Sequence, residues 1–296
     1  MTDIVKIPFE RILVTGAAGK IGRATLDLLA HHGTQVTALS QRFDGPVNAD
    51  RVLTGDTREP DVVARALDDV DAVIHLAAIP HKDAGTPFEV YSTNVLSTFN
   101  VLHQSGERGV RAATIASSIN AYGLPMNHHD VYPAYFPLDE DIPAAIDDWY
   151  SLSKNSDEST ARMAHSHWGI SVVALRLPFV GYQHEIAGYR DGAMTRPHAA
   201  MCEAWSYIDV RDAARAFVLA LTPAEPGAHT VFIAAPATYM PEPTEELLSR
   251  YAPHTPRKRP LVGHEVAIEL VRARELLGFE AHYGLQHHTD PAVGRL

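Results

Sequence analysis

The sequence contains a single cysteine, Cys202, among its 296 residues. One thiol has no partner for an internal disulfide, and this favours a reducing compartment. No apolar run reaches the roughly 18 residues that a membrane-spanning helix needs. Residues 1–10, which include Asp3 and Glu10, have no apolar stretch of the kind found in a signal peptide. Together these absences predict a cytoplasmic protein.

Positive charge is also scarce, since 25 Lys and Arg residues face 36 Asp and Glu residues and the formal net charge is −11. Nucleic acids and anionic membranes both select basic surfaces, so we expect binding to neither.

Zinc-hydrolase patterns are missing as well. The 17 histidines include clusters, but none forms a helical pair four residues apart with a carboxylate, and no cysteine pair accompanies them. We expect no metal site and interpret these histidines as solvated. The clusters are His31 with His32, His128 with His129, His165 with His167, and His287 with His288.

Hydrophobic residues make up 46% of the chain, and they alternate between short apolar runs and amphipathic stretches. Repeated strand–helix–strand units predict a parallel sheet with helices on both faces, because parallel crossovers need that length. We therefore expect an α/β fold with a Rossmann-type, doubly wound parallel sheet. The expected strands span 11–15, 35–39, 51–54, 72–76, 112–116 and 171–177, and the expected helices span 20–32, 59–69, 87–108 and 150–167.

The rhythm changes after Leu177. Residues 178–204 are rich in Gly, Arg and His, which predicts a loop or a segment that covers the substrate. We expect a dinucleotide-binding domain over 1–177 and a small substrate-binding region over 178–296, with 205–235 returning to the Rossmann core. The further elements expected are a helix at 209–221, a strand at 230–234, a helix at 244–251, and mixed strand and helix signals over 261–277.

A glycine-rich turn, with Gly16, Gly19 and Gly22, separates the first expected strand from the first expected helix. Glycines there allow a tight turn, close approach of a pyrophosphate, and close packing of helix on strand. The helix N-terminus then offers free N–H groups to the phosphates. We therefore assign these glycines, with Lys20 and Ile21 between them, to a dinucleotide.

The end of the second strand usually separates NAD from NADP, because an acid there binds the ribose 2′-hydroxyl. This chain has Ser40 at that point and Arg42 shortly after, and both can bind a 2′-phosphate. We favour NADP; the alternative is that Arg42 is a solvated loop residue and NAD binds without the acid. Asp56 can accept a hydrogen bond from the adenine amino group, but an Asp in a turn is equally often a local cap.

Tyr150 and Lys154 lie four residues apart on one expected helix, so both lie on one face of it. A phenol acts as a general base near neutral pH when adjacent cations favour the phenolate. Ser118 follows the fifth expected strand, and the ends of strands are where open α/β sheets place their sites. A serine hydroxyl there can hold the substrate oxygen while the tyrosine moves its proton.

With these features, the chain resembles the extended short-chain dehydrogenase/reductase superfamily, in its NAD-dependent epimerase/dehydratase group, over nearly its whole length. The resemblance rests on the glycine turn, on the Ser–Tyr–Lys trio and on further motifs along the chain. These are Gly55-Asp56, His75-Leu-Ala-Ala78, Asn94, Ser117-Ser118, Tyr122-Gly123, Leu175-Arg176 and Tyr207-Ile-Asp-Val-Arg-Asp212.

The resemblance implies that Ser118, Tyr150 and Lys154 are catalytic, and that Lys154 also binds the nicotinamide ribose. It implies a homodimer formed through the expected helices 87–108 and 150–167. On the same basis we assign further residues to the cofactor and to the substrate. The cofactor residues are Leu76, Ala77, Ala78, Asn94 and Pro178, and the substrate residues are His81, Asn120 and Tyr207.

Three departures from that group bear on the substrate. Dehydratases carry Asp-Glu after the catalytic serine or threonine, whereas residues 119–120 here are Ile and Asn. Nucleotide-sugar epimerases bind the diphosphate with an Asn and an Arg, whereas residues 178–179 and 205–206 here are Pro-Phe and Trp-Ser. The spacing does not show that Arg190, Arg196 or His198 replaces them. We therefore favour a smaller carbonyl, alcohol or sugar substrate.

The leading hypothesis is an NAD(P)-dependent oxidoreductase that moves a hydride between nicotinamide and such a substrate. One alternative is a sugar or sugar-nucleotide epimerase that uses the same trio on a tightly held NAD. The other is a non-catalytic dinucleotide sensor, against which the intact Ser–Tyr–Lys trio argues.

Overall fold

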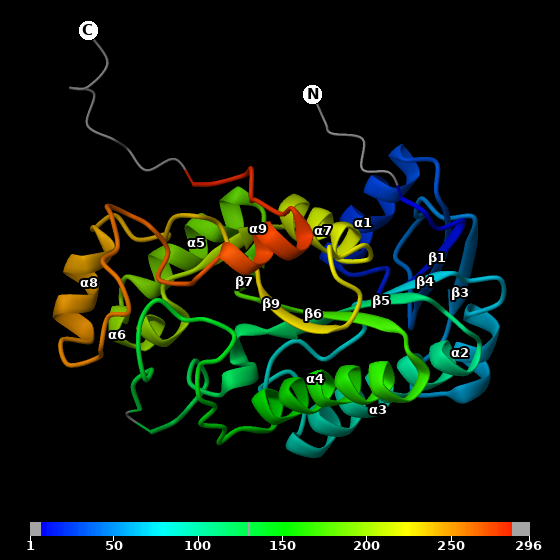
Figure 1. Ribbon diagram of the computed structural model, residues 1–296, viewed down its shortest axis with the longest axis horizontal. Coiled ribbons are helices and arrows are strands. Elements are labelled where there is room, and N and C mark those ends of the chain that lie inside the picture. The colour runs from blue at the N-terminus through cyan, green and yellow to red at the C-terminus, as the bar shows by residue number, and fades with distance from the viewer. Residues whose placement is uncertain (1–6, 130, 286–296) are drawn as a thin grey trace, which may run out of the picture.

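The computed structural model describes residues 7–129 and 131–285 (Figure 1). Two sequence predictions therefore fall partly or wholly outside the described residues. They concern the N-terminal segment, of which residues 1–6 are not described, and the histidine pair His287 and His288. Within the described ranges, no helix combines the length and apolar character that crossing a membrane requires.

The core is a seven-stranded parallel sheet in the order β3-β2-β1-β4-β5-β6-β9. This confirms the predicted Rossmann-type sheet. The direction of winding reverses between β1 and β4, which is where such sheets open a crevice for a ligand. The strands are β1 (Arg11–Thr15), β2 (Gln35–Ser40), β3 (Arg51–Thr54), β4 (Ala72–His75), β5 (Ala112–Ser118), β6 (Ser171–Leu177) and β9 (Ala228–Phe232).

Helices cover both faces of the sheet, as Figure 1 shows. α1 (Lys20–His31) and α7 (Val210–Leu219) lie on one face, and α2 (Pro60–Ala66), α3 (Pro87–Glu107) and α4 (Trp149–Trp168) lie on the other. Side chains alternate across a strand, so Ile12 and Val14 of β1 join one hydrophobic cluster while Leu13 joins the other. This alternation explains why the first strand is apolar along its whole length.

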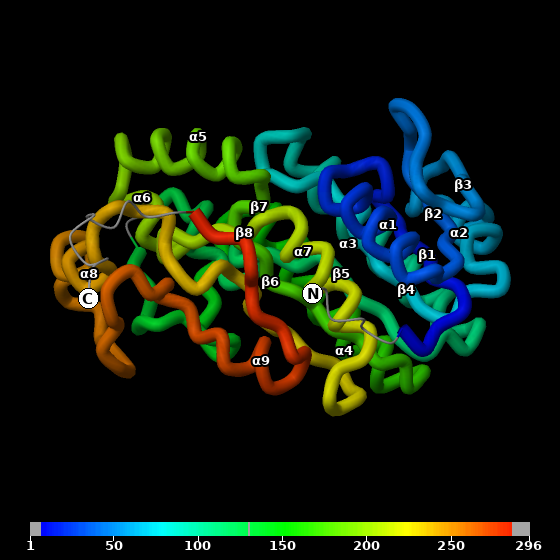
Figure 2. Tube along the Cα trace, turned by 90° about the horizontal axis from the view of Figure 1, so that it is seen from above, coloured from blue at the N-terminus to red at the C-terminus, as the bar shows by residue number. Residues whose placement is uncertain are grey.

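Residues 119–142 and the region after β6 build a third hydrophobic cluster, around Trp205 and Tyr239. The further elements after β6 are β7 (Phe179–Gly181), α5 (Gln183–Ala193), α6 (Pro197–Ala200), the 3-10 helix η2 (Met201–Glu203), β8 (Tyr207–Asp209), α8 (Thr244–Tyr251) and α9 (Val271–Leu277). The 3-10 helix η1 (Ile119–Tyr122) lies directly after β5. A separate sheet of two parallel strands, β7 and β8, also lies after β6. Figure 2 shows that α6 and α8 of the region after β6 lie at the end of the molecule away from β1–β3.

The prediction of a loop in this region was wrong. Residues 178–204 are not a loop, because β7, α5 and α6 form there. α5 buries only Ile186, and its sequence has no apolar periodicity that would have predicted a helix. The helix begins at a capping contact, in which the Glu185 carboxylate accepts a hydrogen bond from the Tyr182 N–H at 2.8 Å. Over 261–277 only the helix α9 forms, and no regular strand accompanies it in that described stretch.

Candidate active site

A cleft of about 520 Å³ opens at the carboxyl edge of the sheet, at the reversal between β1 and β4. Seven of the predicted cofactor residues line it. They share the wall with residues that the sequence analysis did not single out, among them Gln41, Thr57, Arg58, Glu89 and Ser97. The predicted residues in the wall are Gly16, Gly19, Ser40, Asp56, Leu76, Ala77 and Ala78.

The glycine turn closes tightly at the floor of this cleft. The Gly19 N–H donates to the Gly16 carbonyl at 2.9 Å, and Gly16 has a φ of +64°, in the left-handed region. A Cβ on Gly16 would lie 2.6 Å from the carbonyl carbon of Leu76, and one on Gly22 would lie 2.4 Å from the Gly16 oxygen. Side chains at Gly16 and Gly22 would therefore break the close packing of the turn on itself and on the segment after β4.

The remaining predicted cofactor residues lie around the cleft. Lys20 pairs with Glu185 of α5 at 2.6 Å, and thus links the glycine turn to the region after β6. Asn94 accepts a hydrogen bond from the Ile79 N–H at 2.7 Å and donates one to the Ser153 hydroxyl at 3.0 Å. It therefore fixes a cleft-lining residue to α4. Ile21 lies in the first turn of α1, and Pro178 lies between β6 and β7.

The two arginines near Ser40 and Asp56 have different surroundings. The Arg42 side chain is 82% exposed and pairs with Asp44 at 3.0 Å, and it is not among the residues that line the cleft. Arg58 lines the cleft and pairs with Asp56 at 2.6 Å, while Gln41 donates to the same carboxylate at 2.9 Å. Hydrogen bonding to Arg58 holds the pKa of Asp56 below its usual value. In the sequence, the spacing Asp56-x-Arg58 was the pattern that could have predicted this ion pair.

Ser118 is the last residue of β5 and is buried. Its Oγ accepts hydrogen bonds from both the backbone N–H and the side-chain amide of Asn120, each at 3.1 Å. These two donors occupy the acceptor positions of the hydroxyl oxygen, so its own hydrogen is left to donate. Ser118 is therefore prepared to donate a hydrogen bond to an oxygen of a bound molecule.

Tyr150 and Lys154 lie in the first turns of α4, which Asp148 caps by accepting from the backbone N–H groups of Tyr150 and Ser151, both at 2.9 Å. Lys154 Nζ donates to the Ala116 carbonyl at 2.8 Å, two residues before the end of β5. A crossover helix runs antiparallel to its strands, so Tyr150 lies one turn closer to the carboxyl edge than Lys154. Lys154 thus lies close to Ser118 at the end of β5, and Tyr150 lies one turn earlier on the same helix.

A buried ion pair holds this strand end in place. Glu158 of α4 binds the Arg176 guanidinium through both oxygens, at 2.9 and 3.0 Å, and accepts a hydrogen bond from Ser117 at 2.7 Å. The side chains of Glu158 and Arg176 are 2% and 8% exposed. The pair connects α4, β5 and β6 directly behind Ser118.

Comparison with known proteins identifies the architecture. The family model described as the NAD dependent epimerase/dehydratase family matches residues 12–234. The chain belongs to this family. A solved short-chain dehydrogenase/reductase superfamily protein from Agrobacterium tumefaciens with bound NAD has a TM-score of 0.69, is 22% identical, and covers 93% of each chain. The family model thereby confirms the predicted epimerase/dehydratase family, and the structural likeness confirms the Rossmann-type fold.

Two curated relatives match this epimerase/dehydratase family member in sequence over different lengths. The uronate dehydrogenase of Pseudomonas syringae is 27% identical over 173 residues, which are 57% of this chain and 59% of that enzyme. The chain thus spans about three fifths of that relative's length. The UDP-glucose 4-epimerase of Corynebacterium glutamicum is 27% identical over 257 residues, which are 75% of this chain and 74% of that enzyme.

The predicted substrate residues of this family member have different surroundings. His81 is exposed, and its Nδ1 accepts from the Asp83 N–H at 3.1 Å. Asn120 is buried beside Ser118, and its Oδ1 has no hydrogen-bond partner among the described residues. Tyr207 is buried in β8, and its hydroxyl accepts from the Leu285 N–H at 2.6 Å. Asn120 is thus the one of the three that adjoins Ser118.

The place where nucleotide-sugar epimerases carry a diphosphate-binding Arg is closed in this family member. Trp205 is fully buried, and its indole N–H donates to the Pro197 carbonyl at 2.9 Å. Ser206 is also buried, and its hydroxyl donates to the Glu203 carbonyl at 2.5 Å. Neither residue offers a cation to a diphosphate.

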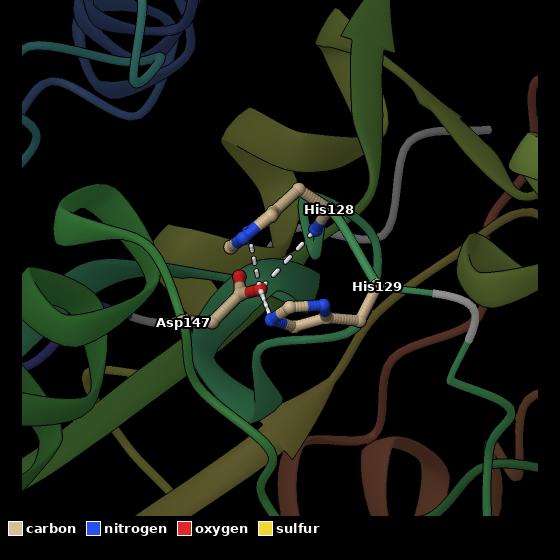
Figure 3. A group of neighbouring side chains, drawn as sticks. All are labelled: His128, His129 and Asp147. Atoms are coloured by element: carbon tan, nitrogen blue, oxygen red, sulfur yellow. Dashed lines mark hydrogen bonds and ion pairs between the residues drawn. The ribbon is translucent and has the colours of Figure 1, made fainter.

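One histidine cluster meets a carboxylate near the start of α4 (Figure 3). His128 Nδ1 lies 2.6 Å and His129 Nε2 lies 3.8 Å from Asp147 Oδ2. The three ligand atoms fall within 4.8 Å of one another, a spacing that can accommodate a cation. The two imidazoles are 72% and 65% exposed. The expectation of no metal stays a prediction here.

Proposed function

We propose that the protein is an NAD(P)-dependent oxidoreductase that transfers a hydride between nicotinamide and a small carbonyl, alcohol or sugar substrate. The observation that supports this proposal is the hydrogen bond from Lys154 Nζ to the Ala116 carbonyl at 2.8 Å, two residues before Ser118, with Tyr150 one turn earlier on the same helix. The dinucleotide cleft opens on the same edge of the sheet. The uronate dehydrogenases among the relatives act on substrates of this size.

The glycine turn fits a dinucleotide, because added Cβ atoms at Gly16 and Gly22 would meet backbone. When bound, the cofactor supplies or accepts the hydride. Ser118 donates a hydrogen bond to the substrate oxygen, and Tyr150 gives that oxygen its proton or removes it. Lys154 binds the nicotinamide ribose and supports the phenolate with its charge. The region after β6 covers the substrate.

The test is a panel of small sugars, uronates, alcohols and carbonyls mixed with NAD, NADP or their reduced forms, with nicotinamide absorbance as the readout. Net oxidation or reduction of the cofactor with at least one substrate supports the proposal. If cofactor binds, no absorbance changes and no sugar isomer forms, the dinucleotide sensor replaces the oxidoreductase.

An epimerase is the second candidate, and the match to a UDP-glucose 4-epimerase over three quarters of both chains favours it. Its signature is interconversion of sugar isomers without net change in nicotinamide absorbance. The buried Trp205 and Ser206 argue against a nucleotide sugar, because a diphosphate there gains no cationic partner.

The preference for NADP over NAD depends on Arg42. We expect Arg42→Ala to weaken NADPH binding up to about tenfold more than NADH binding, because an Arg–phosphate contact is charge-assisted but this side chain is exposed. Fluorescence titration of both reduced cofactors measures the ratio. Arg65→Ala is the matched control, since it removes an exposed cation of α2 that does not line the cleft, and it should affect neither cofactor. Equal losses in Arg42→Ala contradict the preference.

We also propose a homodimer through α3 and α4, because both helices expose large apolar side chains. We expect Leu96→Arg to weaken the dimer by more than about tenfold, since it buries a charge in an apolar interface. Light scattering after gel filtration measures the mass. Val262→Arg, in the region after β6, is the control, and a monomeric wild type contradicts the proposal. The exposed side chains are Phe88, Leu96, Phe99, Leu152 and Met163.

A further inference from the structure

A chain of buried polar side chains extends behind Lys154, away from the cleft. The Thr15 hydroxyl lies 2.7 Å from His75 Nδ1, and the Thr98 hydroxyl lies 3.3 Å from His75 Nε2. Burial, together with the nearby Lys154, lowers the pKa of His75 to about 3. The imidazole is therefore neutral at working pH and supplies no charge to its neighbours.

Asp157 completes this chain from the side of α4. Its Oδ2 lies 3.2 Å from Lys154 Nζ, and its Oδ1 has no hydrogen-bond partner among the described residues. The Asp157 side chain is 1% exposed and the Lys154 side chain is 4% exposed. Within the described ranges, Lys154 Nζ thus donates to a backbone carbonyl and to this carboxylate. In so dry a place an ammonium keeps its charge only if an anion lies beside it.

Other charged groups around Asp157 cannot take over this role. Glu158 is the neighbouring acid on α4, but it already binds Arg176 of β6 through both oxygens. β4 contributes the neutral His75, and α3 contributes the Thr98 hydroxyl. Asp157 is therefore the carboxylate that compensates Lys154.

We propose that Asp157 is a positioning residue that keeps the buried Lys154 ammonium charged and holds its Nζ at the end of β5. The inference rests on the proposed function, because it assigns to Lys154 the support of Tyr150 and of the nicotinamide ribose. Asp157 itself touches neither the substrate nor the cofactor. It acts through Lys154 alone.

The stability cost of this carboxylate supports a functional role. Burial raises the pKa of Asp157 from 3.8 to about 6, against the opposing effect of Lys154. Between pH 3.8 and about pH 6, the folded protein thus binds more protons at Asp157 than the unfolded chain does. The contribution of Asp157 to the free energy of unfolding therefore falls as the pH rises through this window. The ionised carboxylate thus costs stability at neutral pH, as groups at functional sites often do.

The test is Asp157→Asn, which keeps the shape and an acceptor oxygen but removes the charge. Above pH 8 we expect kcat to fall about 10- to 100-fold, the effect of losing a hydrogen bond to a charged group. The alkaline fall in rate should move to lower pH by roughly one unit or more, because an adjacent opposite charge shifts an ionisation by that amount. Glu107→Gln, which removes an exposed carboxylate from α3, is the matched control and should behave as wild type.

Titration of NAD between pH 7 and pH 10 gives a readout that needs no turnover. In Asp157→Asn the NAD dissociation constant should rise with pH, while the wild type and Glu107→Gln stay level. Circular dichroism checks that the variant is folded. If a folded Asp157→Asn matches wild type in both profiles, the inference is overturned. If no substrate is found for any form, the oxidoreductase assignment fails while the NAD titration still decides the role of Asp157.

Discussion

Tyr150→Phe is expected to reduce turnover by about 10²- to 10⁴-fold, the usual contribution of a positioned acid or base. The change removes one hydroxyl and keeps the ring, which is buried at the start of α4. Cofactor binding should persist, because the change leaves the residues that line the dinucleotide cleft and the Lys154 side chain in place. Steady-state rates and NAD titration on the same preparation separate the two effects.

Tyr91→Phe is the matched control, because it removes a partly buried phenol hydroxyl from α3, near Ser156. It should keep the wild-type rate. A Tyr150→Phe protein that turns over at near wild-type rate contradicts the assignment of Tyr150 as the proton donor. Loss of both rate and NAD binding in Tyr150→Phe would instead indicate a structural effect on α4.

The sequence predicted the fold because its strands and helices have strong, regular patterns. β1 is apolar at Ile12, Leu13 and Val14, and each side chain has a hydrophobic cluster to enter. The candidate trio was also predictable, because Ser118 ends a strand and the Tyr150–Lys154 spacing fits one helical face. Local pattern and global fold agree at these positions.

What the sequence could not give are pairings between side chains from separate elements. Arg42 and Arg58 are equivalent cations in the sequence, but only Arg58 faces the cleft, because Asp56 binds it there. Asp157 is an acid, and acids usually face solvent. It is buried because α4 packs against α3 and the sheet, and its importance depends on Lys154 lying at the same depth.

Glu158→Ala is expected to lower the free energy of unfolding by about 3–5 kcal/mol, the usual cost of breaking a buried pair. The Arg176 guanidinium would keep one hydrogen bond, to the Glu140 carbonyl at 3.3 Å, and its contact with the Phe232 ring. Ser117 would lose its acceptor as well. Urea denaturation measures the loss, which is a large part of the roughly 5–15 kcal/mol that holds a typical protein folded.

The double variant Glu158→Leu/Arg176→Met distinguishes an uncompensated charge from lost packing. Replacing both partners removes the charge that Glu158→Ala leaves buried, so the double variant should recover most of the lost stability. A double variant as unstable as Glu158→Ala would mean that the pair contributes through its hydrogen bonds to the strand end. Ser117 and Ser118 are adjacent at the end of β5, so in that case Ser118 would also lose its fixed position. The catalytic rate of the double variant would then fall by more than the loss of folded protein accounts for.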